Sequence, residues 1–197
     1  IFGNQHEGSP GWLMQTFCES AFTFQITVDP FATQDFIALP SSDNPTISMV
    51  PGDPVNWHAV LPTLRRPGEK FRLSIKGDDC WGNPSDRLTG RIKIKANMQV
   101  VGLPDLVDLR FGDFGNVIEG LSVDTPGLLE ITILNESDQV IAKANPLVIR
   151  AYDVAHFWSD MHAQSGETIG VGTAQEYFDF ARNKAFLDIA GHQGNDF

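Results

Sequence analysis

Side chains that can bind a metal ion or transfer a proton gather near the C-terminus of this 197-residue chain. Asp160, His162 and Gln164 occupy alternate positions, and His192 follows thirty residues after His162. A β-strand points residues i, i+2 and i+4 to one face, so the first three side chains are expected to project together. Imidazole and oxygen ligands that converge at a strand end are typical of a hydrolytic divalent metal site. The spacing therefore predicts a metal-binding cluster of these four residues.

Each of these side chains also has a simpler interpretation. His162 and His192 could be strand-end histidines whose ring nitrogens are satisfied by backbone groups. Asp160 could be a direct ligand, or it could fix the imidazole tautomer of His162 through a hydrogen bond. The glycines in 165–172 could let backbone amides contact a phosphate, but loop geometry explains so short a glycine pattern more simply. Residue type alone leaves these alternatives open.

Two predicted strands and one helix would bring the cluster together. The sequence predicts a strand at 156–162, a helix at 174–185 and a strand at 187–191. Thr173 and Glu176 form a capping-box pattern, in which each side chain satisfies a free backbone amide at the start of a helix. This order predicts a βαβ unit with parallel strands and a right-handed crossover. The predicted ligands then follow the carboxyl ends of parallel strands, where α/β folds place their active sites.

The chain before residue 150 has the pattern of an antiparallel β-sandwich. Residues 1–20 are polar with little periodicity, which predicts an extended arm. From residue 21 onwards, short runs of alternating apolar and polar residues end at Gly, Pro or Asn, as in strands joined by turns; the first run has the pattern of a half-buried strand. These runs lie at 22–28, 47–50, 57–60, 71–76, 90–95, 106–111, 117–121, 127–133, 140–142 and 146–150. The predicted domains are an arm at 1–20, an immunoglobulin-like antiparallel β-sandwich at 21–150 and the beginning of an α/β domain at 151–197.

Composition and charge limit the functional classes. Hydrophobic residues make up 42% of the chain, which is enough for a globular core. The formal net charge of −11 argues against a nucleic-acid partner, because affinity for phosphates comes largely from Lys and Arg. No apolar run approaches the ~18 residues that a membrane span needs, so we expect a soluble protein whose compartment, cytoplasmic, periplasmic or secreted, stays open. Cys18 and Cys80 fit two buried thiols more simply than one disulfide.

The predicted cluster resembles a known family pattern. The run Trp158-Ser159-Asp160-Met161-His162-Ala163-Gln164-Ser165 and the run Leu187-Asp188-Ile189-Ala190-Gly191-His192 resemble two motifs of the PHP superfamily of metallohydrolases, named for polymerase and histidinol phosphatase. The first family motif is Asp-Leu-His-x-His-Ser/Thr, and the strand that carries the second typically ends in Thr-Asp-His. Residues 157–197 resemble the N-terminal edge of the catalytic domain in an uncharacterised bacterial branch, whose members carry a β-sandwich ahead of a distorted α/β barrel. Residues 70–83 and 144–146 resemble the same branch more weakly.

The resemblance implies roles only where positions match. His162 matches the first histidine of the first motif and His192 matches the histidine that closes the second, so both are implied as metal ligands. Gln164 stands where the second histidine is expected, and its carbonyl is a weaker ligand for a zinc-like ion. Gly191 replaces the aspartate that usually precedes the last histidine. These departures imply a changed metal set or a changed reaction.

Two further carboxylates lie near the motifs. Glu167 follows the first motif and Asp196 follows the second, so either could compensate for the missing ligand carboxylate or act in catalysis. Their chemistry suggests these roles, whereas the motifs do not. Asp196 could instead cap a turn together with Asn195.

The resemblance also implies an activity and a partner. The implied enzyme is a phosphoesterase-like hydrolase, in which a divalent metal ion (Zn, Mn, Fe or Mg) activates water for attack on a small-molecule substrate such as a phosphate ester. Later strands of the barrel supply further ligands in this family, so we expect a C-terminal segment or a second chain to complete it. Two other functions fit the same sequence. The sandwich could be a ligand- or protein-binding module attached to an inactive, vestigial PHP-like domain, or this piece could serve as a docking partner for the chain that completes the barrel.

Overall fold

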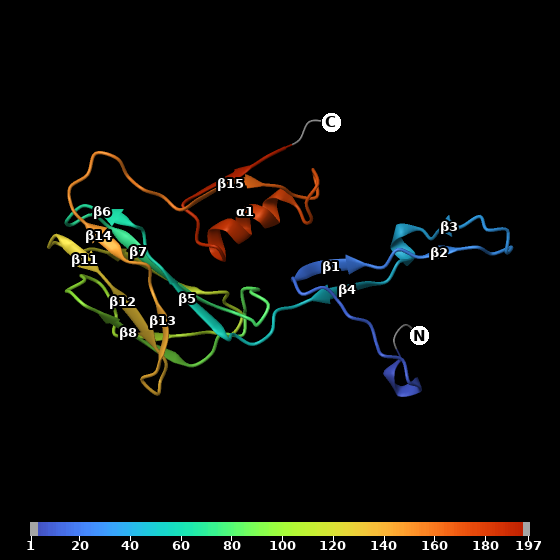
Figure 1. The fold of residues 1–197 in the computed structure, drawn as a ribbon, viewed down its shortest axis with the longest axis horizontal. Helices are drawn as coiled ribbons and strands as arrows, with labels where there is room; N and C mark the ends of the chain where they lie inside the picture. Colours follow the sequence, from blue (N-terminus) through green and yellow to red (C-terminus); the bar gives the residue numbers. More distant parts are fainter. Residues whose placement is uncertain (1–3, 195–197) are drawn as a thin grey trace. The chain divides into compact units, whose positions relative to one another are not determined.

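The computed structural model describes residues 4–194, and the fold is mainly β, with a single α-helix among those residues. The chain forms two compact units, which divide between Pro51 and Gly52. Figure 1 shows both, with the first unit in blue and the second running from cyan to red. The strands at 19–49, which the sequence analysis assigns to the sandwich, belong to the first unit.

The first unit consists of two antiparallel ribbons and short 3₁₀ turns. Its elements are η1 (Gln5–Glu7), β1 (Glu19–Thr23), β2 (Thr27–Val28), β3 (Ile37–Ala38), η2 (Ser41–Asp43) and β4 (Thr46–Met49). β1 pairs with β4, and β2 pairs with β3. Within 4–50, no residue is buried. The prediction of one half-buried strand at 22–28 is therefore wrong: the chain changes its pairing partner between β1 and β2, and no core covers either face.

The second unit contains three larger sheets compatible with a β-sandwich. Their strands are β5 (Asn56–Val60), β6 (Leu64–Arg65), β7 (Phe71–Asp78), β8 (Arg91–Ala96), β9 (Leu106–Asp108), β10 (Asn116–Leu121), β11 (Gly127–Leu129), β12 (Ile131–Leu134), β13 (Val140–Lys143) and β14 (Leu147–Ile149). The strand orders are β10-β7-β5, β13-β12-β8-β9 and β11-β14-β6. All pairs in these sheets are antiparallel except β14 with β6.

One hydrophobic core joins these sheets. Alternate residues of β7, among them Leu73 and Ile75, are fully buried together with Ile131 and Ile133 of β12 and Leu147 of β14. This is the burial that period-two alternation produces when one face of each strand meets the core. The sequence reasoning about 71–76 and 127–133 thus identified residues that carry the core.

A polar loop and one asparagine fix the edges of the sandwich. The carboxylate of Asp79 accepts hydrogen bonds from the backbone amides of Gly52 (3.0 Å), Trp81 (2.8 Å) and Asn83 (2.9 Å). The side-chain amide of Asn145 imitates a strand residue, because its Oδ1 accepts from the Leu61 amide and its Nδ2 donates to the Leu61 carbonyl, both at 2.9 Å. Asp79 and Asn145 therefore hold the backbone at these two positions.

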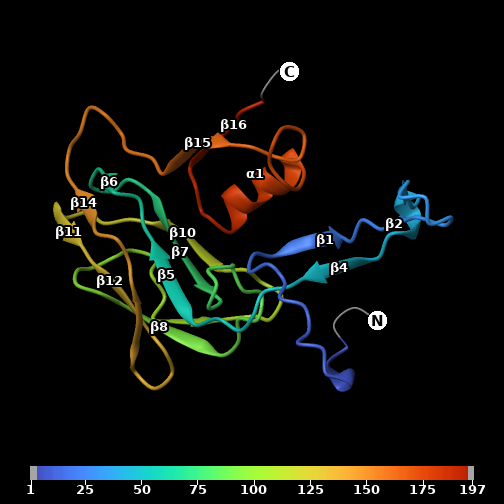
Figure 2. The same ribbon diagram turned by 45° about the vertical axis from the view of Figure 1, so that its right-hand side comes forward.

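The C-terminal segment is a strand, a helix and a strand. β15 (Ser159–Ala163) and β16 (Ile189–His192) pair in parallel, and α1 (Ala174–Asn183) lies between them in sequence. Thr173 caps α1 in the predicted capping box, since its Oγ1 accepts from the Glu176 amide at 3.1 Å and Glu176 Oε2 accepts from the Thr173 amide at 2.7 Å. Figure 2 shows α1 beside the two strands.

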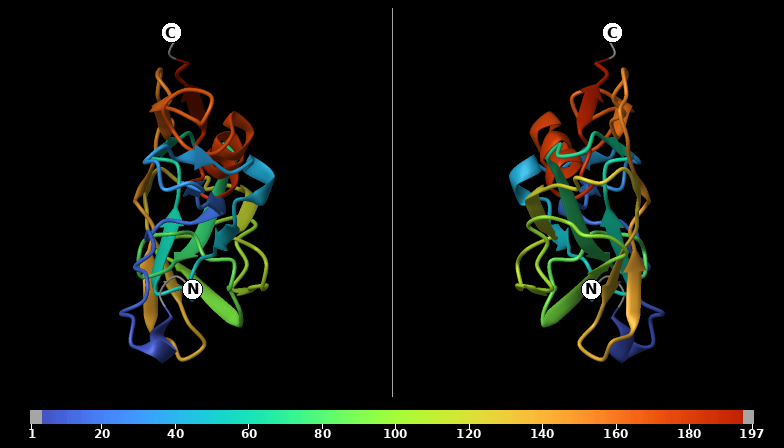
Figure 3. Two further views of the ribbon diagram at one scale, coloured as in Figure 1. Left: turned by 90° about the vertical axis from the view of Figure 1, so that its right-hand side faces the viewer. Right: turned by 90° about the vertical axis from the view of Figure 1, so that its left-hand side faces the viewer.

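This segment contacts the sandwich through a seam formed by Leu61, Arg72, Trp158, Phe186 and Asp188. The Arg72 guanidinium donates to the carbonyls of Phe186 (3.1 Å) and Leu187 (3.3 Å) and to the Asp188 carboxylate (3.1 Å). The Trp158 indole donates to the Leu61 carbonyl at 2.8 Å. In both views of Figure 3 the segment, in red, lies toward one end of the sandwich strands.

Close packing at the seam requires a glycine. A Cβ on Gly115 would lie 2.8 Å from the Phe186 ring and 2.8 Å from the Ile75 carbonyl oxygen. Phe186 itself is buried and has a left-handed backbone, with φ of 59°. That conformation is unfavourable for a non-glycine residue, so burial of the ring against the sandwich must offset it.

The sequence analysis favoured two buried cysteine thiols. Neither Cys18 nor Cys80 forms a disulfide, and both are exposed, so the prediction of buried thiols is wrong. Each lies in an irregular stretch and not on a core-facing strand position.

Within residues 4–194, no helix has the length and apolar character of a membrane span.

Candidate functional site

The ends of β15 and β16 bring the two motifs into contact. The parallel register places Ala163 opposite His192. Beyond Ala163 the chain turns inward, and Ser165 is completely buried. The Nε2 atom of His192 lies 2.9 Å from Ser165 Oγ, a hydrogen bond whose direction depends on the imidazole tautomer. The first and second motifs therefore meet through Ser165 and His192.

A shift of register interrupts the pairing of β15 with β16 among the predicted ligands. Asp160 stands opposite Ala190 and Ala163 stands opposite His192, so β15 uses one more residue than β16 over this stretch. Such a bulge interrupts the alternation of side chains between the two faces of a strand. Asp160 and His162 are exposed, whereas Oε1 of Gln164 is buried. The expectation that all three project together from a regular strand is therefore not met.

Asp160 contacts His162 through the backbone. Its Oδ1 accepts a hydrogen bond from the His162 amide at 3.0 Å, whereas the sequence analysis considered a contact to the imidazole. Burial raises the pKa of Tyr177 of α1, and the negative charge of Asp160 raises it further. Its hydroxyl donates to the Gly191 carbonyl at 3.5 Å, a long hydrogen bond.

Aromatic rings from α1 hold the second histidine. The ring centroid of His192 lies 6.2 Å from that of Tyr177 and 6.4 Å from that of Phe178. The hydrogen bond between Nε2 and Ser165 and the two aromatic rings of α1 together position the imidazole. No hydrogen bond to its Nδ1 occurs among the described residues. We call Gln164, Ser165, Tyr177 and His192 the strand-end cluster.

The glycine-rich loop after Ser165 is closed by its own backbone. The Gly166 amide donates to the Gly172 carbonyl at 2.6 Å, and the Gly170 amide donates to the Ser165 carbonyl at 2.9 Å. A Cβ on Gly170 would lie 2.8 Å from the backbone of Gln164. The glycines are thus required by tight loop geometry, and these amides are already used inside the loop.

Of the two predicted catalytic carboxylates, the structure describes only Glu167. Glu167 lies in this loop with an exposed side chain, and its amide donates to Ser165 Oγ at 3.2 Å. Asp196, with Asn195, lies outside the described residues. Across 4–194, no group of three or more His, Cys, Asp or Glu side chains is arranged to hold a metal ion.

The residues present fit only part of a metal site. Oε1 of Gln164 is buried and has no hydrogen-bond partner among the described residues, and a buried polar atom without a partner is unfavourable by about 1–3 kcal/mol. Gln164 Oε1 and His192 Nδ1 are each chemically able to bind a metal ion. His162 and Asp160 are exposed, so a complete ligand set requires groups beyond those described.

Sequence reasoning missed the roles of Ser165 and Tyr177. A signal for Ser165 was present, because it occupies the Ser/Thr position of the first motif, but its partner follows only from the parallel register. Tyr177 is not part of the predicted metal cluster, and its contacts with Gly191 and His192 depend on how α1 packs.

Comparison with known proteins adds no family assignment. The chain matches no protein-family model and no curated protein sequence.

Proposed function

We propose that this chain is the N-terminal part of a PHP-like, metal-dependent hydrolase that acts on phosphate esters. The observation that carries the proposal is the 2.9 Å contact between Ser165 of the first motif and His192 of the second. Two segments that resemble separate motifs of one family meet at the carboxyl ends of two parallel strands. This is the edge at which α/β folds bind substrates and metals.

His192 and Gln164 would hold a divalent ion, with His162 and Asp160 at its rim. A divalent ion at this edge would supply water activated near neutral pH and a charge that polarises the scissile bond. The chain's own contribution is to orient His192, through Ser165 and the rings of α1, and to exclude water from Gln164. Glu167 and Asp196 remain proposed catalytic carboxylates.

We also propose that further strands, from a C-terminal segment or a second chain, complete this sheet. Parallel sheets are stable almost only when they have several strands and both faces covered. β15 and β16 form a sheet of two strands among the described residues. Large apolar side chains are exposed on this strand–helix–strand segment: Met161, Phe178, Phe180 and Ile189. Additional strands would cover them and bring the remaining ligands.

The alternative is a sandwich that binds a ligand or a protein beside a vestigial PHP-like domain. Two observations favour it: the glutamine at position 164 in place of a histidine, and the absence of a three-residue metal group within 4–194. Zinc binding separates the two functions, because a vestigial domain needs no metal ligands.

Zinc titration against a competing chelator dye tests the hydrolase proposal. The protein purified together with the segment or chain that completes its sheet should bind one equivalent of Zn²⁺, and His192→Ala should weaken that binding at least about tenfold, because one ligand is lost. His156→Ala is a matched control, since His156 is exposed and lies outside the strands. Native mass spectrometry of protein purified from its host should also show zinc and the chain that completes the sheet.

The two variants distinguish the hydrolase from the binding module. Loss of zinc affinity in His192→Ala but not in His156→Ala supports the metal site. Equal zinc affinity of His192→Ala and the unmodified chain would exclude His192 as a ligand and leave the binding module as the better function.

A further inference from the structure

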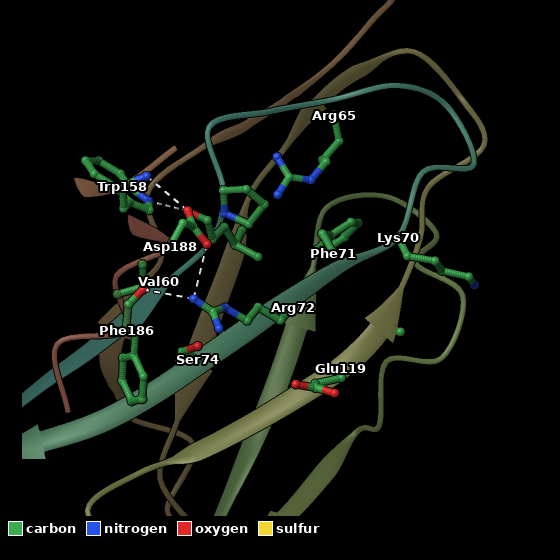
Figure 4. A pocket seen from close by; sticks show the side chains of 13 residues that line it. Val60, Arg65, Lys70, Phe71, Arg72, Ser74, Glu119, Trp158, Phe186 and Asp188 are labelled. Atoms are coloured by element: carbon green, nitrogen blue, oxygen red, sulfur yellow. Dashed lines mark hydrogen bonds and ion pairs between the residues drawn. The ribbon is translucent and has the colours of Figure 1, made fainter. Parts of the chain in front are cut away.

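An open cavity of about 340 Å³ lies at the seam between the sandwich and the C-terminal segment. Sites for small organic ligands begin at about 300 Å³, so this cavity can admit one. Strands β5, β6, β7 and β10 supply one side, and Trp158, Phe186 and Asp188 supply the other (Figure 4). None of its lining residues belongs to the strand-end cluster.

Charged side chains of both signs line the cavity. Arg65, Lys70 and Arg72 line it together with two carboxylates, Glu119 and Asp188. Arg72 and Asp188 form an ion pair at 3.1 Å. Lys70 Nζ donates to Ser122 Oγ at 3.2 Å, and Figure 4 shows this side chain directed away from Trp158 and Asp188. Arg65 forms an ion pair with Glu69, which is outside the lining, and is the remaining cation that faces the cavity. A guanidinium that faces a cavity favours an anionic ligand.

Arg65 has donors available for that ligand. Its side chain is only 13% exposed, and Figure 4 shows the guanidinium directed toward the Trp158 and Asp188 side of the cavity. Nη1 donates to the Leu64 carbonyl at 2.8 Å, while Nε lies 3.9 Å from Glu69, beyond hydrogen-bond distance. A guanidinium carries five N–H donors in a planar fork that matches the oxygens of a carboxylate or phosphate. Most of these donors are not used within the described structure.

The remaining wall is apolar and aromatic. Phe71 and Phe186 are buried, at 5% and 3% exposure, and Val60, Leu61 and Pro62 extend the same surface. A cavity with an apolar wall and a few placed polar groups is typical of a site for a small organic molecule. Inorganic phosphate would leave this wall uncovered, so the ligand should carry an apolar group.

We infer that this cavity binds a small organic anion, with its carboxylate or phosphate on Arg65 and its apolar group against Phe186 and Trp158. Because the two walls come from the sandwich and from the C-terminal segment, such a ligand also binds the two together. This inference does not depend on the proposed hydrolase function.

Isothermal titration calorimetry with phenyl phosphate, phenylacetate and inorganic phosphate tests the inference on the full chain. At least one phenyl compound should bind about tenfold more tightly than inorganic phosphate, because burial of a ring contributes beyond the oxyanion. The preferred phenyl compound tells whether the natural ligand is a phosphate or a carboxylate. If neither phenyl compound binds at about 10 mM, the inference is wrong.

Two variants and one control locate the binding. Arg65→Gln should weaken binding of the preferred phenyl compound at least about tenfold, since the charged, bidentate hydrogen bonds from the guanidinium are lost. Glu119→Gln should strengthen it about threefold, because the opposing carboxylate is exposed and its loss leaves the lining more positive. Arg87→Gln should change nothing, as Arg87 pairs with Asp53 at the surface outside the cavity. Weakening in Arg87→Gln equal to that in Arg65→Gln, or unchanged binding in both cavity variants, would overturn the assignment.

Discussion

Replacing Arg72 by alanine should release the C-terminal segment from the sandwich and lower the free energy of unfolding by about 2–3 kcal/mol. One guanidinium holds the Phe186 carbonyl, the Leu187 carbonyl and the Asp188 carboxylate. Without it, the two carbonyls and Oδ1 of Asp188 lose this donor, although Oδ2 still accepts from the Trp158 amide. Phe186 then loses the contacts that offset its left-handed backbone.

Hydrogen exchange measures this release directly. In Arg72→Ala, the amides of α1 and β16 should exchange faster, while those of β7 and β12 in the sandwich core keep their protection. Arg91→Ala is the control, because Arg91 pairs with Asp108 on the exposed surface of the sandwich and exposed ion pairs contribute little. If Arg72→Ala leaves exchange in α1 unchanged, other contacts at the seam suffice to hold the segment.

Replacing Asp79 by alanine should destabilise the sandwich by about 2–4 kcal/mol, the second large effect. Its buried carboxylate accepts from the amides of Gly52, Trp81 and Asn83 and from the Asn83 side chain. Alanine would leave these donors without an acceptor. Urea denaturation gives the change, and Asp86→Ala provides a nearby control, since Asp86 is not fully buried.

The same carboxylate makes stability depend on pH in the acid range. Burial alone would raise the pKa of Asp79, but hydrogen bonds from Asn83, Gly52 and Trp81 outweigh it and lower the pKa from 3.8 to about 2. A pKa below the unfolded value stabilises the fold above pH 3.8, and this contribution of about 2 kcal/mol disappears as pH falls from about 4 to about 2. Asp79→Asn should lose this part of the acid dependence in urea midpoints measured across that range. A parallel decline in both proteins would contradict the assignment.

The sequence predicted the core of the sandwich well and its periphery poorly. Alternation at 71–76 and 127–133 reports which side chains share a face of a strand, and in these strands that face meets the core. Alternation at 22–28 looks the same, yet nothing in 4–50 is buried, because the pattern does not say whether a second layer covers the face. Strands of two residues, such as β3 and β6, are too short to show a period.

For the candidate site, sequence signals between neighbouring residues predicted the structure correctly, whereas the register between β15 and β16 could not be predicted. The Thr173 capping box requires only residues close in sequence, and the helix begins where it predicts. The bulge between Asp160 and Ala163 depends on pairing with β16, so the spacing of Asp160, His162 and Gln164 could not reveal it. The Ser165–His192 contact likewise needs the parallel alignment of strands far apart in sequence.

The N-terminal ribbons have a consequence for how the protein can be handled. Residues 1–64 contain neither Lys nor Arg, while the first unit exposes aromatic side chains such as Trp12, Phe31 and Phe36. Trypsin therefore has no cleavage point before Arg65, whether the ribbons are folded or open, whereas chymotrypsin finds accessible targets in a unit without a buried core. Survival of this region in a tryptic digest reflects its composition, and only an aromatic-specific protease can report how firmly the ribbons are held.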